Sequence, residues 1–334
     1  MNILITSVGR RTYLVNYFKE AMGKGDEIHV ANSSAYTTAF AVADKSVITP
    51  LIYDGNYIPF LLNYCKENKI DAIISLFDVD LPILSASKDK FLEIGVKVIV
   101  SDYRFVSIAN DKWKTFTFLK KNKFNVPKTY LTLKAVQQAL TKKEIDYPIM
   151  IKPRFGMGSI GLKIAQNKEE LAFYYRKILQ EIKKSYLKYE SASKRNVIIF
   201  QEMLNGQEYG VDIINDLDGK YIVSVVKKKL AMRAGETDCA EVVLNNDILD
   251  ESKRLAVYTN HIANLDSDWF LVDGKPYVLE LNARFGGGYP FSHVAGVNLP
   301  KAIVCWLKGE EVTAELFEYK TNIVVQKEIV LKEI

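Results

Sequence analysis

Strand-like and helix-like patterns alternate through the first hundred residues, and this alternation restricts the chain to very few folds. Short apolar runs typical of buried strands occur at 2–6, 27–33, 71–76 and 96–101. Helical patterns separate them, for example over 12–22 and 57–68. Strands that alternate with helices form a parallel sheet with helices on both faces. The sequence therefore predicts an α/β, Rossmann-like domain over 1–109, with its ligand site at the carboxyl ends of the strands.

Two polar features stand at these strand ends. A dinucleotide site needs three glycines in a GxGxxG turn, but here Gly9 is followed by Arg10 and Arg11. The missing glycines argue against an NAD site. Asp78 and Asp80 follow the third strand-like run, where they fit either a helix N-terminus or a contact with a ligand. The sequence leaves both interpretations open.

The composition is that of an ordinary soluble enzyme. Of the 334 residues, 48% are hydrophobic and 25% are charged, and the formal charge of +5 is too small to predict nucleic-acid binding. Cys65, Cys239 and Cys305 are far apart, which favours a reducing compartment over a disulfide framework or a zinc site. No apolar run approaches the roughly 20 residues that span a membrane, and the first residues do not read as a signal peptide. We expect a cytoplasmic protein that binds neither nucleic acid nor membranes.

The pattern changes after about residue 109. A capped basic helix comes first, and then a strand, a glycine-rich turn and a long amphipathic helix, at 147–153, 154–161 and about 168–187. From residue 196 onward the strands read as antiparallel hairpins, one joined through Asp218-Gly219 and another over 267–284. The sequence thus predicts an α+β region in two parts, over 110–195 and 196–334.

The glycine-rich turn is the strongest chemical signal. It follows Lys152 at a strand end and contains Gly156, Gly158 and Gly161, with Ser159 among them. Glycines let the backbone bend over a phosphate with several N–H groups pointing inward, and a lysine adds a point charge. A plain glycine hairpin has the same pattern. A phosphate flap and a structural turn therefore stay as alternatives.

A second signal is the alternation of polar side chains in the last hairpin. Glu280 and Asn282 share one face of a strand, Asp268 lies on the partner strand, and Arg284 follows two residues later. Carboxylate and amide oxygens suit Mg²⁺, and an arginine can hold phosphate. A solvated strand face would explain the same alternation.

The turn of this hairpin decides whether the oxygen donors share a face. A three-residue loop, Asp273-Gly274-Lys275, places Asp268 opposite Glu280. It also directs Leu279 and Leu281 into the core. A two-residue turn, which the sequence permits as well, would place Asp268 opposite Leu279. We predict the three-residue loop because it does not bury Asp268 unpaired.

A third segment, at 201–213, bends through Asn205-Gly206 between two strands. In their order along the chain, the three segments resemble the ATP-grasp superfamily. They are most similar to its single-unit carboxylate–amine ligases that are like the large subunit of carbamoyl phosphate synthetase. The resemblance covers nearly the whole chain. It implies a Rossmann-like pre-ATP-grasp domain followed by a two-lobed ATP-grasp fold, with a small lid domain and a C-terminal domain that carries the magnesium site.

The resemblance also implies roles for individual residues. The residues that it assigns to ATP are Lys112, Lys152, Gly156, Gly158, Ser159, Gly161, Glu202, Leu204 and Glu208. In this assignment the lysines hold the phosphates under the glycine turn. The backbone of Glu202 and Leu204 in the third segment meets adenine, and Glu208 binds the ribose. Mg²⁺, or Mn²⁺ in its place, is assigned to Asp268, Glu280 and Asn282. Arg284 and Lys152 are the expected catalytic residues.

The expected activity is an ATP- and Mg²⁺-dependent ligation. A small-molecule carboxylate attacks the γ-phosphate of ATP, and an amine captures the acyl phosphate. A small-molecule kinase and a nucleotide-binding module without catalysis are the alternatives, and a homodimer is left open. Two departures from the usual pattern are Ala283 in place of proline, which is not a ligand, and Gln201 where an acid is frequent. There is one grasp unit and no glutaminase segment, so full carbamoyl phosphate synthesis is not expected.

The sequence does not assign a functional role to several other polar residues. A basic cluster, consisting of Lys227, Lys228, Lys229 and Arg233, ends a strand and enters a loop, where it fits either binding of the acceptor or a solvated charge run. His261 falls in a helical pattern and is expected to be structural. His293 lies near the predicted site and receives no role.

Overall fold

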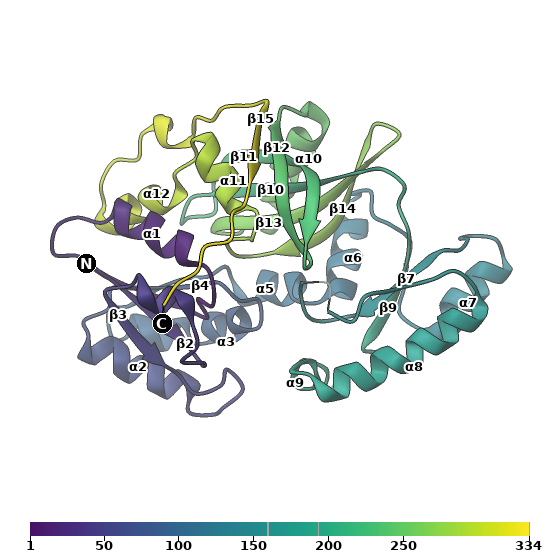
Figure 1. The fold of residues 1–334 in the computed structure, drawn as a ribbon, viewed down its shortest axis with the longest axis horizontal. Helices are drawn as coiled ribbons and strands as arrows, with labels where there is room; N and C mark the ends of the chain where they lie inside the picture. The colour runs from purple at the N-terminus through teal and green to yellow at the C-terminus, as the bar shows by residue number, and fades with distance from the viewer. Residues whose placement is uncertain (159, 193, 334) are drawn as a thin grey trace.

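The computed structural model describes residues 1–158, 160–192 and 194–333, and its strands form three sheets. In Figure 1 the first sheet lies at the lower left and the third above it, while the second sheet and its long helix extend to the right. No helix within these described ranges is long and apolar enough to cross a membrane.

The first sheet is parallel throughout, with the order β3-β2-β1-β4-β5, as the alternating pattern predicts. Its strands are β1 (Asn2–Thr6), β2 (Glu27–Asn32), β3 (Lys45–Ile48), β4 (Ala72–Ser75) and β5 (Lys97–Ile99). The helices of this region are α1 (Thr12–Ala21), α2 (Tyr57–Glu67), α3 (Asp80–Ala86), α4 (Lys88–Leu92) and α5 (Tyr103–Ala109), with a short 3₁₀ helix, η1 (Thr38–Ala41). Side chains of β1 alternate between two cores, since Leu4 packs with α2 and α3 while Ile3 and Ile5 pack with α1.

The second sheet is antiparallel, with the order β6-β9-β7-β8. Its strands are β6 (Thr129–Tyr130), β7 (Ile149–Pro153), β8 (Lys163–Ala165) and β9 (Ile198–Glu202). Helix α6 (Lys112–Lys121) precedes it, and α7 (Leu133–Thr141), α8 (Lys168–Lys184) and α9 (Leu187–Ser191) complete it. A small separate core joins Ile149 and Ile151 of β7 to Leu171 and Ile178 of α8.

The third sheet has six antiparallel strands in the order β14-β13-β10-β11-β12-β15. They are β10 (Gln207–Asn215), β11 (Tyr221–Arg233), β12 (Glu236–Val243), β13 (Ala263–Val272), β14 (Lys275–Asn282) and β15 (Ile323–Gln326). The remaining helices are α10 (Asn246–Thr259), α11 (Tyr289–Ala295), α12 (Leu299–Lys308) and the 3₁₀ helix η2 (Ala314–Phe317). Helix α10 covers one face through Ile248 and Leu255, so the polar side chains of the central strands point to the other face.

The turn between β13 and β14 differs from the prediction. Val272 pairs with Lys275, so the turn has two residues, and Asp273 and Gly274 have φ values of 48° and 74°. This is the mirror-image turn that matches strand twist, and it favours a residue such as Asp followed by Gly. The three-residue loop is therefore wrong.

Asp268 nevertheless lies opposite Glu280, because the register shifts by one residue between Asp268 and Trp269. The extra residue is Leu279, which forms a β-bulge. As a result Leu279 lines the cavity described below instead of entering the core, where Val278 and Leu281 are buried. The predicted pairing is correct, while the predicted core position of Leu279 is wrong.

Two further expectations need correction. The segment that was expected to be a loop contains strand β12. The strand forms because buried residues, such as Ala240 and Val242, alternate with more exposed ones along it. His261 follows the end of α10 instead of lying inside a helix. It is fully buried, and its Nε2 lies 2.9 Å from the carbonyl oxygen of Ile213, which agrees with the expected structural role.

Candidate active site

A cavity of about 300 Å³ lies between the glycine turn of the second sheet and the polar face of the third. Of the residues predicted to form a site, those that line it are Lys112, Lys152, Gly156, Gly158, Glu208, Asp268, Glu280, Asn282 and Arg284. Gly161, Glu202 and Leu204 are not among the lining residues. Ser159 lies outside the described residues.

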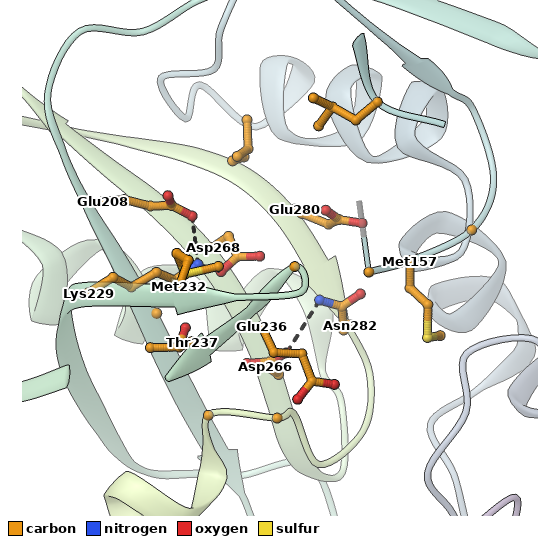
Figure 2. A pocket seen from close by; sticks show the side chains of 18 of the residues that line it. Met157, Glu208, Lys229, Met232, Glu236, Thr237, Asp266, Asp268, Glu280 and Asn282 are labelled. Carbon is orange, nitrogen blue, oxygen red and sulfur yellow. Dashed lines mark hydrogen bonds and ion pairs between the residues drawn. The ribbon is translucent and has the colours of Figure 1, made fainter. Parts of the chain in front are cut away.

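Three neighbouring strands, β10, β13 and β14, supply carboxylates to the wall of this cavity. Asp268 of β13 pairs with Gly210 of β10 and Glu280 of β14, and the next rung joins Asp212, Asp266 and Asn282. Residues two apart on a strand share a face, and Figure 2 shows Asp266, Asp268, Glu280 and Asn282 around the same cavity. The pairing of strands from distant parts of the sequence thus produces one polar surface.

Lys152 is the most unusual cation of the site. Its side chain is only 5% exposed, and within the described ranges it forms no ion pair. Burial lowers the pKa of Lys152 to about 8, although Glu280 nearby opposes this effect. A buried ammonium group without a paired carboxylate is unfavourable, so this position favours an anionic ligand.

Lys112 connects the glycine turn to the β13–β14 hairpin. Its Nζ lies 2.9 Å from a carboxylate oxygen of Glu280 and also donates to the carbonyl oxygen of Gly156. Burial acts against ionisation of Glu280, but Lys112 and Lys152 outweigh it and lower the pKa of the carboxyl group. Glu280 is therefore charged and faces two cations.

The base of the glycine turn is fixed by a buried ion pair. Asp111 caps α6 by accepting from the backbone N–H of Trp113 and Lys114. The same carboxylate holds Arg154 through two hydrogen bonds, at 2.6 and 2.7 Å. Gly156 and Gly158 follow with φ values of 93° and 62°, which side chains disfavour. The sequence thus places a bend at a defined position above Lys152.

Asp268 and Glu208 both pair with Lys229, a contact that the sequence did not predict. Lys229 Nζ lies 2.5 Å from Asp268 and 2.6 Å from Glu208. Burial acts against the charge of Lys229, but the two carboxylates outweigh it and raise its pKa. In this structure Glu208, which was predicted to bind ribose, is thus held within the cavity wall.

Asp266 is a carboxylate of the site that sequence reasoning missed. Burial and the neighbouring Asp268 raise the pKa of Asp266 to about 7. Its Oδ2 accepts from Asn282 Nδ2 at 3.4 Å, and a Cβ at Gly286 would overlap its carboxylate. The rule that selected alternate residues on β14 would have selected Asp266 together with Asp268 on β13.

The two aspartates after β4 have different contacts. Asp78 is buried and forms a close ion pair with Arg284, at 2.6 Å from Nη2 and 2.7 Å from Nε. Burial acts against the charge of Arg284, but Asp78 and Asp266 outweigh it and raise its pKa. Asp80 instead accepts hydrogen bonds from four hydroxyl groups, those of Thr6, Ser7, Tyr57 and Ser75. Asp78 therefore orients a cavity residue, and Asp80 fixes the turn after β1.

The oxygen donors of the cavity suit a hydrated Mg²⁺ that is completed by phosphate. Asp268, Glu280 and Asn282 present two carboxylates and one amide on one face, beside the buried carboxyl group of Asp266. In the part of the chain that the structure describes, no three Asp, Glu, His or Cys side chains could hold a metal by themselves. Mg²⁺ is usually bound by one or two carboxylates together with substrate phosphates and waters, so the donor set fits an ion that arrives with a nucleotide.

The basic cluster does not act as one unit. Lys227 and Lys229 point into the cavity, and Lys227 pairs with the buried Asp212. Lys228 lies between them on the strand and therefore faces the other side. Arg233 pairs with Asp238 at 3.0 Å. Alternation along β11 thus contradicts a single acceptor-binding cluster.

The segment predicted to meet adenine has other contacts in this structure. A carboxylate oxygen of Glu202 accepts from the backbone N–H of Lys128 at 2.6 Å. Gln201 donates to Thr129, and its Oε1 has no hydrogen-bond partner within the described ranges. Gln201 lines a small cavity that adjoins the main one and shares Lys152 with it. His293 stacks on Tyr17, with ring centroids 3.6 Å apart, and does not line the cavity.

A small antiparallel sheet with a glycine turn, facing a larger sheet with a carboxylate-rich hairpin behind a Rossmann-like domain, defines a nucleotide-binding protein of the ATP-grasp class. The chain belongs to the ATP-grasp family, since the model of the ATP-grasp domain matches residues 109–288, more than half of its length. The N-terminal domain of PylC-like proteins matches residues 3–99.

Curated relatives are similar over most of this chain. The large chain of carbamoyl phosphate synthase from Pseudothermotoga lettingae is 24% identical over 311 residues, which are 89% of this chain and 26% of that protein. The corresponding protein of Clostridium perfringens is also 24% identical, over 92% of this chain and 28% of its own length. The chain spans about a quarter of the length of these relatives.

Solved structures share the fold. The biotin carboxylase domain of Hydrogenobacter thermophilus 2-oxoglutarate carboxylase has a TM-score of 0.74 and 17% identity, covering 97% of this chain and 73% of that one. The L-amino acid ligase of Bacillus licheniformis has a TM-score of 0.72 and 19% identity, covering 92% and 75%. The α/β and α+β architecture expected from the sequence is confirmed.

Proposed function

We propose that the protein is an ATP-dependent ligase that activates a small carboxylate as an acyl phosphate and joins it to an amine, releasing ADP and phosphate. The observation that carries the proposal is the placement of Lys152. This buried lysine has no ion pair among the described residues, and it lies under a glycine turn and opposite the carboxylates of the β13–β14 hairpin. A triphosphate would meet positive charge from Lys152 and Lys112 and could share a cation with Glu280.

The residues of the cavity suit phosphoryl transfer, which depends on position and charge neutralisation more than on covalent help. A carboxylate oxygen of the substrate attacks the γ-phosphorus, and the bond to the bridging oxygen breaks, so that ADP leaves. Lys152 and Arg284 neutralise charge on the transferred group. The amine then attacks the acyl carbon, loses a proton and displaces phosphate. Mg²⁺, or Mn²⁺, held by Asp268, Glu280 and Asn282 with the nucleotide, would supply further charge neutralisation.

Two of the similar structures support this proposal at the level of chemistry. The biotin carboxylase domain was crystallised with MgADP and bicarbonate, and the Bacillus licheniformis protein is an L-amino acid ligase. Both the nucleotide and amide-bond formation are therefore compatible with this fold.

The test is a product assay on the full chain. Carboxylates and amines are combined in pairs with MgATP, ADP and phosphate are measured separately, and products are identified by mass spectrometry. The proposal predicts equal amounts of ADP and phosphate only when both substrates are present. A phosphorylated acceptor without free phosphate would indicate a kinase, and MgATP binding without turnover would indicate a binding module, so either result would overturn the proposal.

A further inference from the structure

A second cation of the cavity has an incomplete set of partners. Arg11 lies in the turn after β1 and lines the cavity. Its Nη1 donates to the carbonyl oxygens of Leu76 and Phe285, at 3.0 and 2.8 Å. Across the described residues, no carboxylate pairs with Arg11, and neither Nε nor Nη2 has a hydrogen-bond partner. Three N–H groups of this guanidinium are thus available.

The two carbonyl contacts fix the orientation of the free edge. Leu76 follows β4 of the first sheet, and Phe285 follows β14 of the third, so both parts of the molecule hold the same nitrogen. A guanidinium fixed in this way presents Nε and Nη2 side by side, which is the geometry that binds a carboxylate through two parallel hydrogen bonds. Such a group loses little conformational freedom when the ligand binds.

The electrostatic surroundings favour an anion at this edge. Burial lowers the pKa of Arg11, and the nearby Arg284 lowers it further. Arg284 is already paired with Asp78, so it does not need the same ligand. An anionic group at Arg11 would offset both the cost of burying its charge and its repulsion by Arg284.

A carboxylate of the protein lies at the same end of the cavity. Glu236, at the start of β12, lines the cavity and is close enough to Arg11 to affect its pKa. Figure 2 places Glu236 at the end of the cavity that holds Asp266, away from Glu208. Its one ion pair within the described ranges is a 3.5 Å contact with Lys327, and its side chain is 56% exposed. The compartment thus offers a fixed cation and a largely exposed carboxylate with one long ion pair.

We propose that this end of the cavity binds an amino acid, or another small amino carboxylate, as the amine substrate, with its carboxylate on Arg11 and its ammonium group facing Glu236. The inference rests on the proposed function, because it names the class of the amine. A compound with only one of these groups would engage only Arg11 or only Glu236. The two ends of the cavity then have separate tasks, with phosphates near Lys152 and the amino acid near Arg11.

The experiment measures binding to the full chain in the presence of MgADP. The probes are the twenty standard amino acids, and for each one that binds, its carboxamide and its decarboxylated amine. We expect at least one amino acid to bind and its carboxamide to bind about 10- to 150-fold more weakly, since a charge-assisted hydrogen bond is lost. This comparison uses the unchanged protein, so it does not depend on the folding of a variant.

Variants then locate the effect. Arg11→Met should weaken amino acid binding by the same factor and leave carboxamide and MgADP binding unchanged, and Arg11→Lys should restore part of the loss. Arg10→Met is the matched control, because Arg10 is the exposed neighbour. If no amino acid binds, if the carboxamide binds equally well, or if a folded Arg11→Met variant binds normally, the inference is wrong. Failure of the unchanged protein to bind MgADP would instead count against the proposed function.

Discussion

Asp268 and Glu280 lie opposite each other although the turn that joins their strands is one residue too short for that pairing. The β-bulge at Leu279 makes up the difference. It turns Leu279 and Glu280 toward the same cavity and leaves Asp268, Glu280 and Asn282 on one face. The proposed magnesium site therefore depends on a local irregularity and not on a regular hairpin.

The first prediction concerns Glu280. Glu280→Gln keeps the size of the side chain but removes a charge that faces Lys112 and Lys152. We expect ATP turnover at saturating Mg²⁺ to fall by at least about 100-fold, because preorganised charge at a phosphoryl-transfer site is lost. The loss of turnover should far exceed the loss of stability. Glu241→Gln on β12 is the control, since Glu241 does not line the cavity. Equal turnover in both variants would remove Glu280 from the site.

The second prediction concerns Lys152. Lys152→Met should weaken ATP binding by about 10- to 150-fold, as expected for one charge-assisted hydrogen bond. The fold should stay intact, because burying an uncharged side chain there removes an unfavourable buried charge. Calorimetric titration with MgATP measures the affinity, with the exposed Lys183→Met as the control. Unchanged affinity in Lys152→Met would contradict the assignment.

The third prediction is a pH dependence. Burial lowers the pKa of Lys152 in the free protein to about 8, below the ordinary lysine value of 10.5. The charged form binds phosphate, so ATP affinity should decline as the pH rises above about 8, and the decline should be absent in Lys152→Met. The same shift acts on stability with the opposite sign. The unfolded chain binds the proton more tightly between pH 8 and 10.5, so Lys152 contributes stability that grows with pH across that window.

The fourth prediction concerns the backbone of the glycine turn. Gly156 has a φ of 93°, and a Cβ there would lie 2.6 Å from a methyl carbon of Leu187. Gly156→Ala should therefore strain the turn by at least about 1 kcal/mol and weaken MgATP binding. Gly55→Ala is the matched control, because Gly55 has open space around its Cα and no positive φ. Denaturant unfolding and nucleotide titration measure both effects, and identical results for the two variants would contradict the strain.

The fifth prediction concerns acid stability. Burial lowers the pKa of His261 from 6.5 to about 4. The unfolded chain thus binds this proton more readily, and stability is lost as the pH falls from 6.5 toward 4, by about 3 kcal/mol in all. His261→Gln should lose that much less stability over the same range. Urea unfolding at several pH values decides the point, and parallel curves for the two proteins would show that His261 is not responsible.

Much of the architecture could be predicted from local patterns. The strand-like runs at 2–6 and 71–76 became neighbouring parallel strands, because alternation of strands and helices leaves few other arrangements. Strand β3 had no comparable signal, since Lys45 and Ser46 are exposed at the edge of the sheet. Strand β12 was mistaken for a loop because only one of its buried positions, Val242, holds a large apolar residue, while the others hold Asp238 and Ala240.

The site was predictable only in part. Glu280, Asn282 and Lys152 stood out by residue type and spacing, although a solvated strand face and a plain glycine hairpin would have produced the same patterns. Asp266 followed the same spacing rule on the partner strand but was overlooked. Lys229 and Asp78 gave no sign of their partners, because the contacts join strands and loops that are distant in sequence.

The amino-acid sequence by itself determined the order of the sheets, the glycine turn and the face on which alternate polar residues of each strand lie, since these follow from backbone geometry over a few residues. Only the tertiary structure decided the bulge at Leu279, the pairing of Asp78 with Arg284 and the free edge of Arg11. Each of these features depends on contacts between segments that are distant in the sequence. The cost of burying a charge there depends on which groups surround it in the cavity, and local sequence does not specify those groups.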